Sequence, residues 1–252
     1  MRLVRFRFGD RIATGALDGE DVRLLRGTFF DDPVPTGEAV PTADVRLLAP
    51  VLPSKVVAVG RNYADHADEM GVEMPEEPMV FLKPSTSVIG PGDPIAYPPI
   101  SKRMDYEGEL ACVVGRITRR VTSEDAARAI LGYTCANDVT LRDLQATDGQ
   151  WARAKGFDTS CPLGPWVETE LDPADVAVET RLNGELRQSA RTSQLAFDPA
   201  EIVAFISTFM TLLPGDIVLT GTPAGVGPLE VGDEVSVEIE GVGRLANTVV
   251  AA

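Results

Sequence analysis

Hydrophobic and polar residues alternate along short segments of the chain, and this spacing predicts a protein built mainly from β-strands. Successive side chains of a strand point to opposite faces, so alternation marks a segment with one buried face. Leu3 to Phe8 alternates in this way, and Val22 to Leu25 is a second expected strand, reached through a turn at Asp18-Gly19. The polar, proline-containing stretch 31–44 predicts a linker. We therefore expect residues 1–50 to form a small N-terminal β domain.

The remainder of the chain, residues 51–252, consists of short apolar runs that are separated by turn signals. The expected strands cover residues 55–60, 79–82, 107–115, 132–136, 217–221 and 235–239, with a hairpin over 176–188. The expected helices cover 62–71, 123–131 with Ser123 as N-cap, and 199–210, and a further helix begins near Leu141. Because strands and helices do not alternate regularly, the pattern predicts an α+β fold that is mainly β with peripheral helices.

Charge and composition exclude several classes of function. The chain has 252 residues, with 23 Lys and Arg against 38 Asp and Glu, a formal net charge of −15. Such a surface repels polyphosphate, so we expect no nucleic-acid partner. No apolar run approaches the length of a membrane span, and Met1 to Arg11 lacks the apolar core of a signal peptide. The three cysteines are widely spaced, which is typical of small buried hydrophobes in a reducing compartment. A cytoplasmic protein without a membrane partner is expected.

The clearest chemical signal is the pair Glu107 and Glu109. Residues two apart on a strand point to the same face, so the two carboxylates lie side by side. Like charges this close repel unless a cation lies between them, and oxygen ligands suit Mg²⁺ or Mn²⁺. Asp138 follows the apolar run 132–136 and is a possible third ligand. The alternatives are two ordinary glutamates at a solvent-facing edge and an aspartate that caps the next helix.

His66 is the only histidine, and it lies three residues before Glu69 within a predicted helix. Residues at this spacing share a helix face, so the carboxylate can orient the imidazole and raise its basicity, as in a general base. The alternative is a solvated pair on the surface. Several cations and amides elsewhere in the chain can complete an anion pocket: Lys83, Arg142, Gln145 and Lys155. The alternative for each of these charges is an exposed position on the surface. The glycine-rich segment 220–227 lacks the lysine of a phosphate loop, which disfavours nucleotide binding, but it can offer backbone N–H groups and the Thr222 hydroxyl to a carboxylate.

The order of these motifs resembles the fumarylacetoacetate hydrolase family. The runs that carry the resemblance are Lys55-Val-Val-Ala-Val-Gly-Arg-Asn-Tyr-Ala-Asp-His66, Phe81-Leu-Lys-Pro-Ser85, Asp105-Tyr-Glu-Gly-Glu-Leu110, Asn137-Asp-Val-Thr-Leu-Arg-Asp-Leu-Gln145, Ala154-Lys-Gly-Phe-Asp158 and Leu213-Pro-Gly-Asp-Ile-Val-Leu-Thr-Gly-Thr-Pro223. The resemblance covers residues 51–252, the expected catalytic domain, whereas residues 1–50 carry little of it. It is nearest to the acylpyruvase, oxaloacetate decarboxylase and 2-hydroxyhepta-2,4-diene-1,7-dioate isomerase-like members.

The resemblance implies a rolled mixed β-sheet, a homodimer, and a role for each matching residue. It implies Mg²⁺ or Mn²⁺ on Glu107, Glu109 and Asp138. His66 and Glu69 form the implied catalytic dyad on a mobile lid, and Lys155 is the third catalytic residue. The implied substrate-binding residues are Lys83, Arg142, Gln145 and Thr222.

The implied activity is metal-dependent cleavage of a C–C bond in a small 2-oxo acid through an enolate. It would be either acylpyruvate hydrolysis or oxaloacetate decarboxylation. One alternative is an isomerase or tautomerase of 2-hydroxy-diene dicarboxylates from aromatic catabolism. Another is a non-catalytic protein that binds a metal or a metabolite.

Overall fold

The first fifty residues form an antiparallel meander in the computed structural model, which describes all residues from 1 to 252. Its strands are β1 (Arg2–Phe8), β2 (Arg11–Asp18), β3 (Asp21–Arg26), β4 (Val34–Pro41) and β5 (Arg46–Leu47). The linker expected over 31–44 is wrong, because β4 pairs with β3 along this stretch. Nearly every β4 residue is exposed, so this edge strand carries no apolar alternation. The turn at Asp18-Gly19 does exist, but it joins β3 to β2, a strand that we had not expected.

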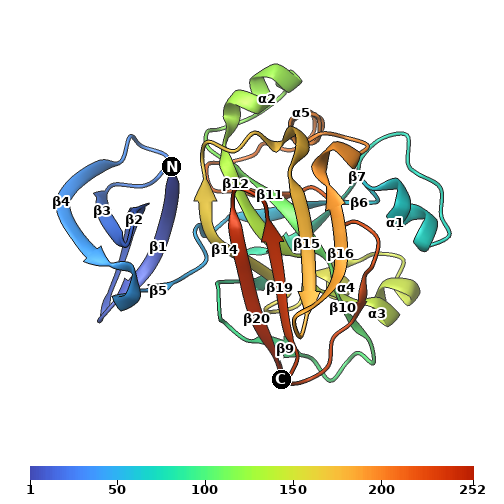
Figure 1. The fold of residues 1–252 in the computed structure, drawn as a ribbon. Coiled ribbons are helices and arrows are strands. Elements are labelled where there is room, and N and C mark those ends of the chain that lie inside the picture. The colour runs from blue at the N-terminus through green and yellow to red at the C-terminus, as the bar shows by residue number, and fades with distance from the viewer.

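The meander continues into a sheet of twelve strands that runs through the rest of the chain. Further strands of this sheet are β6 (Lys55–Gly60), β7 (Met79–Pro84), β8 (Val88–Ile89), β11 (Gly108–Val114), β12 (Ile130–Asn137), β14 (Cys161–Glu168) and β17 (Ile217–Leu219). Its main order is β4-β3-β2-β1-β14-β12-β11-β17-β6-β7, with β5 beside β1 and β8 beside β14. The meander lies at one side of the molecule (Figure 1). The division into domains at residue 50 stays a prediction.

Two smaller sheets complete the roll. One contains β16 (Glu185–Arg191), β15 (Ala177–Leu182), β19 (Glu234–Ile239), β20 (Gly243–Ala251) and β9 (Ile95–Tyr97), in this order. The other contains β13 (Thr140–Leu141), β10 (Met104–Tyr106) and β18 (Gly227–Pro228). The largest apolar cluster, 20 buried residues, joins Leu110 and Cys112 of β11 to Val178 and Val237 of the five-stranded sheet. This shared core fixes the beginning of β11, where the candidate ligands lie, against the β15–β16 hairpin.

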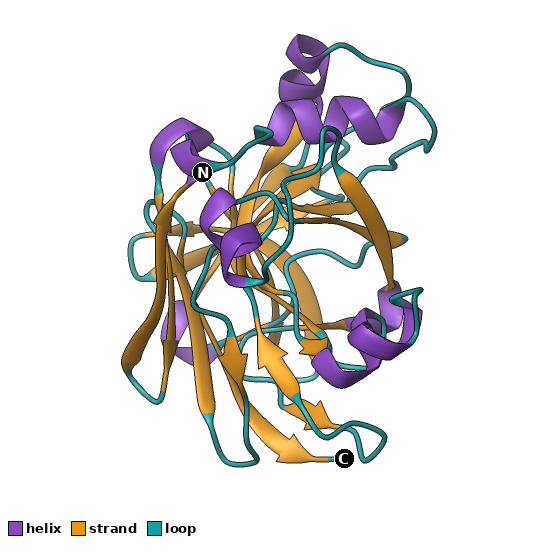
Figure 2. Ribbon diagram, turned by 90° about the vertical axis from the view of Figure 1, so that its right-hand side faces the viewer, coloured by secondary structure: helices purple, strands orange, loops and turns teal.

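Short helices lie around the sheets, as Figure 2 shows. They are α1 (Ala64–Glu69), α2 (Ser123–Ala129), α3 (Arg142–Thr147), α4 (Ala152–Lys155) and α5 (Pro199–Ser207), with 3-10 turns at Thr42–Asp44, Ser85–Ser87, Pro173–Asp175 and Thr192–Gln194. The N-cap of α2 is Thr122 and not Ser123, because the Thr122 side chain accepts the N–H of Asp125. The helix ends at residue 129 because Ile130 already belongs to β12. None of the helices has the length and apolar character that crossing a membrane requires.

The predicted fold class is confirmed: mixed sheets form the body of the molecule and helices stay at its periphery. The candidate site forms where the ends of three neighbouring strands of the large sheet meet. β17 runs parallel to β6 and antiparallel to β11, so the ends of β6 and β17 meet the beginning of β11. The residues that follow β6 and β17 and that precede β11 therefore face one another.

Candidate active site

The strand register explains why three carboxylates that are distant in sequence meet. Gly108 of β11 pairs with Asn137 of β12, so Glu107 and Asp138 lie opposite one another just beyond the same end of this strand pair. The N–H of Asp138 donates to the carbonyl oxygen of Glu107 at 2.8 Å. Glu109 points to the same side as Glu107, and ligand atoms of all three carboxylates lie within 4.8 Å of one another. The solvent-facing edge and the helix cap, the two alternatives to a joint site, are both absent from the structure: all three side chains are buried.

Burial and neighbouring charges push two of these carboxyl groups in opposite directions. The pKa of Glu107 falls to about 2, because the opposing effect of burial is outweighed by the cations of Lys155 and Arg142. The pKa of Glu109 rises well above its ordinary value, through burial and through repulsion by Asp138 and Glu107. Glu109 forms no ion pair, and the N–H of Gly221 donates to it at 2.6 Å. One buried carboxylate of the cluster thus lacks a positive partner.

This donor set fits a hard divalent cation. Three buried carboxylates supply oxygen ligands and leave further positions of an octahedral ion for water or substrate, the usual arrangement for Mg²⁺ and Mn²⁺. A cation there would remove the repulsion that Glu109 experiences. Glu107, Glu109 and Asp138 are the residues that would hold it.

Two lysines lie against the carboxylates, but only one faces the pocket. The ammonium group of Lys155 donates to Glu107 and to Asp138, at 2.7 Å each. The pKa of Lys155 is raised, since Asp138 and Glu107 outweigh the effect of burial, so this residue stays a cation. Lys83 is fully buried, donates to the other oxygen of Asp138 at 2.7 Å, and also donates to the Lys155 carbonyl. Lys83, which the resemblance assigns to the substrate, lies behind Asp138 and does not line the pocket.

The Arg142 guanidinium is held by three partners. Its Nη2 donates to Glu107 at 2.7 Å, its Nη1 to the Gln145 amide oxygen at 2.7 Å, and its Nε to Asp105 at 2.9 Å. Asp105 is completely buried, so it fixes the direction in which the guanidinium points. Arg142 and Gln145 both line the pocket as the sequence analysis expects, and they reach it as one hydrogen-bonded unit.

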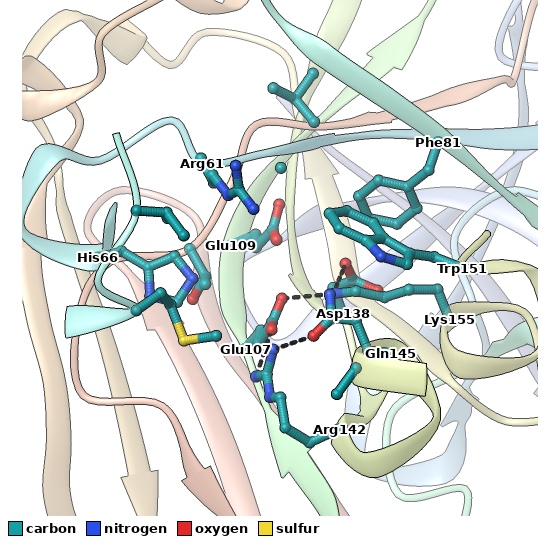
Figure 3. A pocket seen from close by; sticks show the side chains of 16 residues that line it. Arg61, His66, Phe81, Glu107, Glu109, Asp138, Arg142, Gln145, Trp151 and Lys155 are labelled. Atoms are coloured by element: carbon teal, nitrogen blue, oxygen red, sulfur yellow. Dashed lines mark hydrogen bonds and ion pairs between the residues drawn. The ribbon is translucent and has the colours of Figure 1, made fainter. Parts of the chain in front are cut away.

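His66 is a pocket residue and not part of a solvated surface pair. Its ring is buried, and Nδ1 lies 3.2 Å from a carboxylate oxygen of Glu69. An ionised carboxylate only accepts hydrogen bonds, so Nδ1 carries the proton and Nε2 is left as the basic nitrogen. The Asn62 side chain anchors the start of this segment through Phe197 and the carbonyl of Thr220. The ring projects into the pocket opposite Phe81 and Trp151, with the carboxylates between them (Figure 3).

The glycine-rich loop 220–227 does offer its N–H groups to carboxylates, but these belong to the protein itself. Gly221 donates to Glu109, and Gly225 donates to both oxygens of Glu69 at 3.1 and 3.2 Å. Thr222 lines the pocket, and its hydroxyl donates to the Gly108 carbonyl at 2.9 Å. The loop therefore connects the expected dyad to the strand that carries the expected metal ligands.

The pocket has a volume of about 330 Å³, and its lining includes further side chains that are not candidates from the sequence, among them Arg61, Phe81 and Trp151. Arg61 and Phe81 occur within the motifs that carry the family resemblance, which was the available signal. Arg61 adopts a left-handed backbone conformation with φ of 62°, which is unusual for a residue with a side chain. Trp151 packs edge-on against Phe81, with ring centroids 5.3 Å apart, and only the fold brings it to the pocket.

Two family models and curated relatives match the chain. Residues 55–250 match the fumarylacetoacetate (FAA) hydrolase C-terminal family, and residues 1–50 match the Rv2993c-like, N-terminal family. Protein Rv2993c of Mycobacterium tuberculosis is 52% identical over 260 residues, which cover 99% of this chain and 98% of that protein. The mitochondrial oxaloacetate tautomerase Fahd2a of Rattus norvegicus is 45% identical over 223 residues, covering 84% of this chain and 71% of that protein.

Solved structures show the same fold. The 2-hydroxyhepta-2,4-diene-1,7-dioate isomerase from Mycobacterium marinum aligns with a TM-score of 0.93 and 49% identity, covering 100% of this chain and 98% of that one. The fumarylpyruvate hydrolase from Pseudomonas aeruginosa, solved with Mn²⁺ and pyruvate, aligns with a TM-score of 0.76 and 37% identity, covering 82% and 92%. The family model, these relatives and the buried carboxylate cluster agree with the motif resemblance, and the chain therefore belongs to the fumarylacetoacetate hydrolase family.

Proposed function

We propose that this protein is a divalent-metal-dependent tautomerase or isomerase of small 2-oxo acids, which moves a proton between carbon 3 and the 2-oxo oxygen. One observation carries the proposal: His66, which is paired with Glu69, and the carboxylate cluster of Glu107, Glu109 and Asp138 line one pocket. A proton carrier and a site for a Lewis acid are the two groups that enolisation of a 2-oxo acid requires.

Each side chain has a defined task in the proposed reaction. A cation bound by the three carboxylates would draw electrons from the 2-oxo oxygen and so acidify the neighbouring C–H bond. His66 Nε2 removes the proton from carbon 3, and Glu69 stabilises the imidazolium that forms. The ammonium of Lys155 stabilises the negative charge that develops on oxygen. His66 then returns one proton to the substrate, so the product has the same atoms as the starting compound.

The comparisons support tautomerisation ahead of the C–C bond cleavage that the motifs first suggested. The relative named oxaloacetate tautomerase and the structure named isomerase are both more similar to this chain than the fumarylpyruvate hydrolase is. Cleavage is the second candidate, because the free Nε2 of His66 can equally activate a water for attack on a distal carbonyl. Decarboxylation of oxaloacetate would need the same enolate and no attacking water.

The test is an assay of protein that has been stripped of metal with a chelator and then supplied with Mn²⁺ or Mg²⁺. We expect the metal to accelerate the loss of the enol absorbance of oxaloacetate while the mass of the compound stays unchanged. Pyruvate from oxaloacetate, or acetate from acetylpyruvate, would instead establish cleavage. If Mn²⁺ binds and neither compound reacts faster than in buffer, the enzyme proposal is wrong and a metal- or metabolite-binding protein takes its place.

We also propose that the chain acts as a homodimer. Light scattering of the purified protein tests this, and a single species with the mass of one chain would contradict it.

A further inference from the structure

Gln188 of β16 is completely buried, and every polar atom of its amide has a partner. Its Oε1 accepts the N–H of Gly108 at 3.0 Å. Its Nε2 donates to the Thr222 hydroxyl and to the Pro223 carbonyl, at 2.8 Å each. A backbone N–H can only donate and a carbonyl can only accept, so these contacts admit one orientation of the amide. Gln188 does not line the pocket and has no task in the reaction described above.

The partners of Gln188 belong to two different parts of the site. Gly108 lies between Glu107 and Glu109, so its position sets the spacing of two candidate metal ligands. Strand packing is tight here, because a Cβ on Gly108 would lie 2.0 Å from the Thr180 hydroxyl oxygen of β15. Thr222 and Pro223 belong to the loop that faces the substrate side. A single buried amide therefore joins the ligand-bearing strand to the loop.

This arrangement also decides the polarity of Thr222. Its hydroxyl proton is directed to the Gly108 carbonyl, and one of its lone pairs accepts from Gln188. The oxygen has one acceptor position left, so towards the pocket it presents an acceptor and no donor. We had expected this hydroxyl to donate to a substrate carboxylate. In this geometry it suits a donor such as a ligand hydroxyl or a water.

We propose that Gln188 is a positioning residue: it fixes the spacing of Glu107 and Glu109 through Gly108, and it holds Thr222 as an acceptor towards the pocket. The inference rests on the proposed function both for the metal site and for the kinetic readout. The loop has a second, independent attachment, because the Tyr106 hydroxyl donates to the Gly225 carbonyl at 3.0 Å. Loss of the Gln188 amide therefore loosens the centre of the loop without releasing it.

The experiment compares two variants with a matched control. Gln188→Met keeps the length of the side chain and removes all three hydrogen bonds. Gln188→Glu keeps an acceptor for the Gly108 N–H and removes both donors to the loop. The control is Thr180→Ser: Thr180 is the β15 partner of Gln188 and is fully buried, and serine keeps the hydroxyl that packs against Gly108 while it removes only a methyl group. For each variant, Mn²⁺ affinity is measured by electron paramagnetic resonance without substrate, and KM and kcat are measured with oxaloacetate. The thermal stability of the chelator-treated protein is measured by melting, which shows whether each variant is folded.

We expect Gln188→Met to weaken Mn²⁺ binding about 10- to 100-fold, the usual effect of losing an outer-shell partner, and to raise KM. Gln188→Glu should raise KM without weakening Mn²⁺ binding, which separates the loop from the ligand strand. Thr180→Ser should change neither the Mn²⁺ affinity nor KM. If Gln188→Met kept the wild-type Mn²⁺ affinity and KM, this inference would be overturned and the proposed function would stand. The same holds if Gln188→Glu lost as much Mn²⁺ affinity as Gln188→Met. A wild-type protein that neither binds Mn²⁺ nor turns over substrate would overturn the proposed function as well.

Discussion

Replacing Glu109 by glutamine should have opposite effects on metal binding and on the stability of the metal-free protein. Glu109 is buried, forms no ion pair and accepts one backbone N–H. Glutamine keeps the shape and an acceptor for that N–H but removes the charge. The variant loses one of three carboxylate ligands, so its Mn²⁺ affinity falls. Without metal, however, it no longer has to bury a carboxylate that Asp138 and Glu107 repel, so it should be the more stable protein.

The size of the gain follows from proton linkage. The pKa of Glu109 is raised in the folded state, above about 4.3 in the unfolded chain. Between these two values the folded protein binds one more proton than the unfolded chain, so the stability of the wild type falls as pH rises. The slope is at most about 1.4 kcal/mol per pH unit. The advantage of Glu109→Gln should therefore be small near about pH 5 and reach at most about 4 kcal/mol near about pH 7.

The assay is urea unfolding in the presence of a chelator at both pH values, with Mn²⁺ titration in parallel. Glu107→Gln is the matched comparison, because Glu107 is paired with Lys155 and Arg142 and its pKa is lowered to about 2. That group stabilises the protein above its unfolded pKa, so its loss should cost about 3 kcal/mol at neutral pH. Both variants should lose metal affinity. If Glu109→Gln destabilises the metal-free protein as much as Glu107→Gln does, the uncompensated charge that we infer at Glu109 does not exist.

Three further predictions test the site. His66→Ala should lower kcat about 10²- to 10⁴-fold and leave Mn²⁺ affinity unchanged. Its control is Asp65→Asn on the exposed side of the same helix, which should change neither kcat nor Mn²⁺ affinity. Full activity of His66→Ala on the true substrate would exclude the dyad. Lys83→Met should act on stability, by about 3–5 kcal/mol, because it leaves the buried Asp138 short of a partner, and a change confined to KM would place Lys83 on the substrate instead. The Mn²⁺ affinity of the wild type should weaken as pH falls through the raised pKa of Glu109, because metal binding then releases a proton. Calorimetry in two buffers at several pH values measures both the proton release and the affinity, and an affinity that does not change with pH would contradict this prediction.

The local sequence was enough to predict ten of the twenty strands and to select the carboxylates that meet at the candidate site. Alternation and turn residues are local properties, so the strand at 55–60 and the hairpin around Asn183-Gly184 occur where expected. The spacing of Glu107 and Glu109 places both on one side of a strand without any tertiary information. The predictions are wrong where burial gives no periodic signal. The pattern predicts a linker where the exposed strand β4 lies, and it extends α2 by two residues because Ile130 and Leu131, which belong to β12, are apolar like helix-core residues.

Long-range pairing decided what each charged residue does. The sequence alone could not show that Lys83 lies behind Asp138 while Lys155 faces the pocket, because only the fold determines on which side of Asp138 each lysine lies. Nor could it show that Gln188, 80 residues from Gly108, closes a hydrogen bond to it, or that Trp151 reaches the pocket. The residue types and their local spacing come from the chain itself. The charge balance at the carboxylates, which leaves Glu109 without a partner, arises only where β11, β12 and β17 meet, since burial and the neighbouring charges are properties of the folded state.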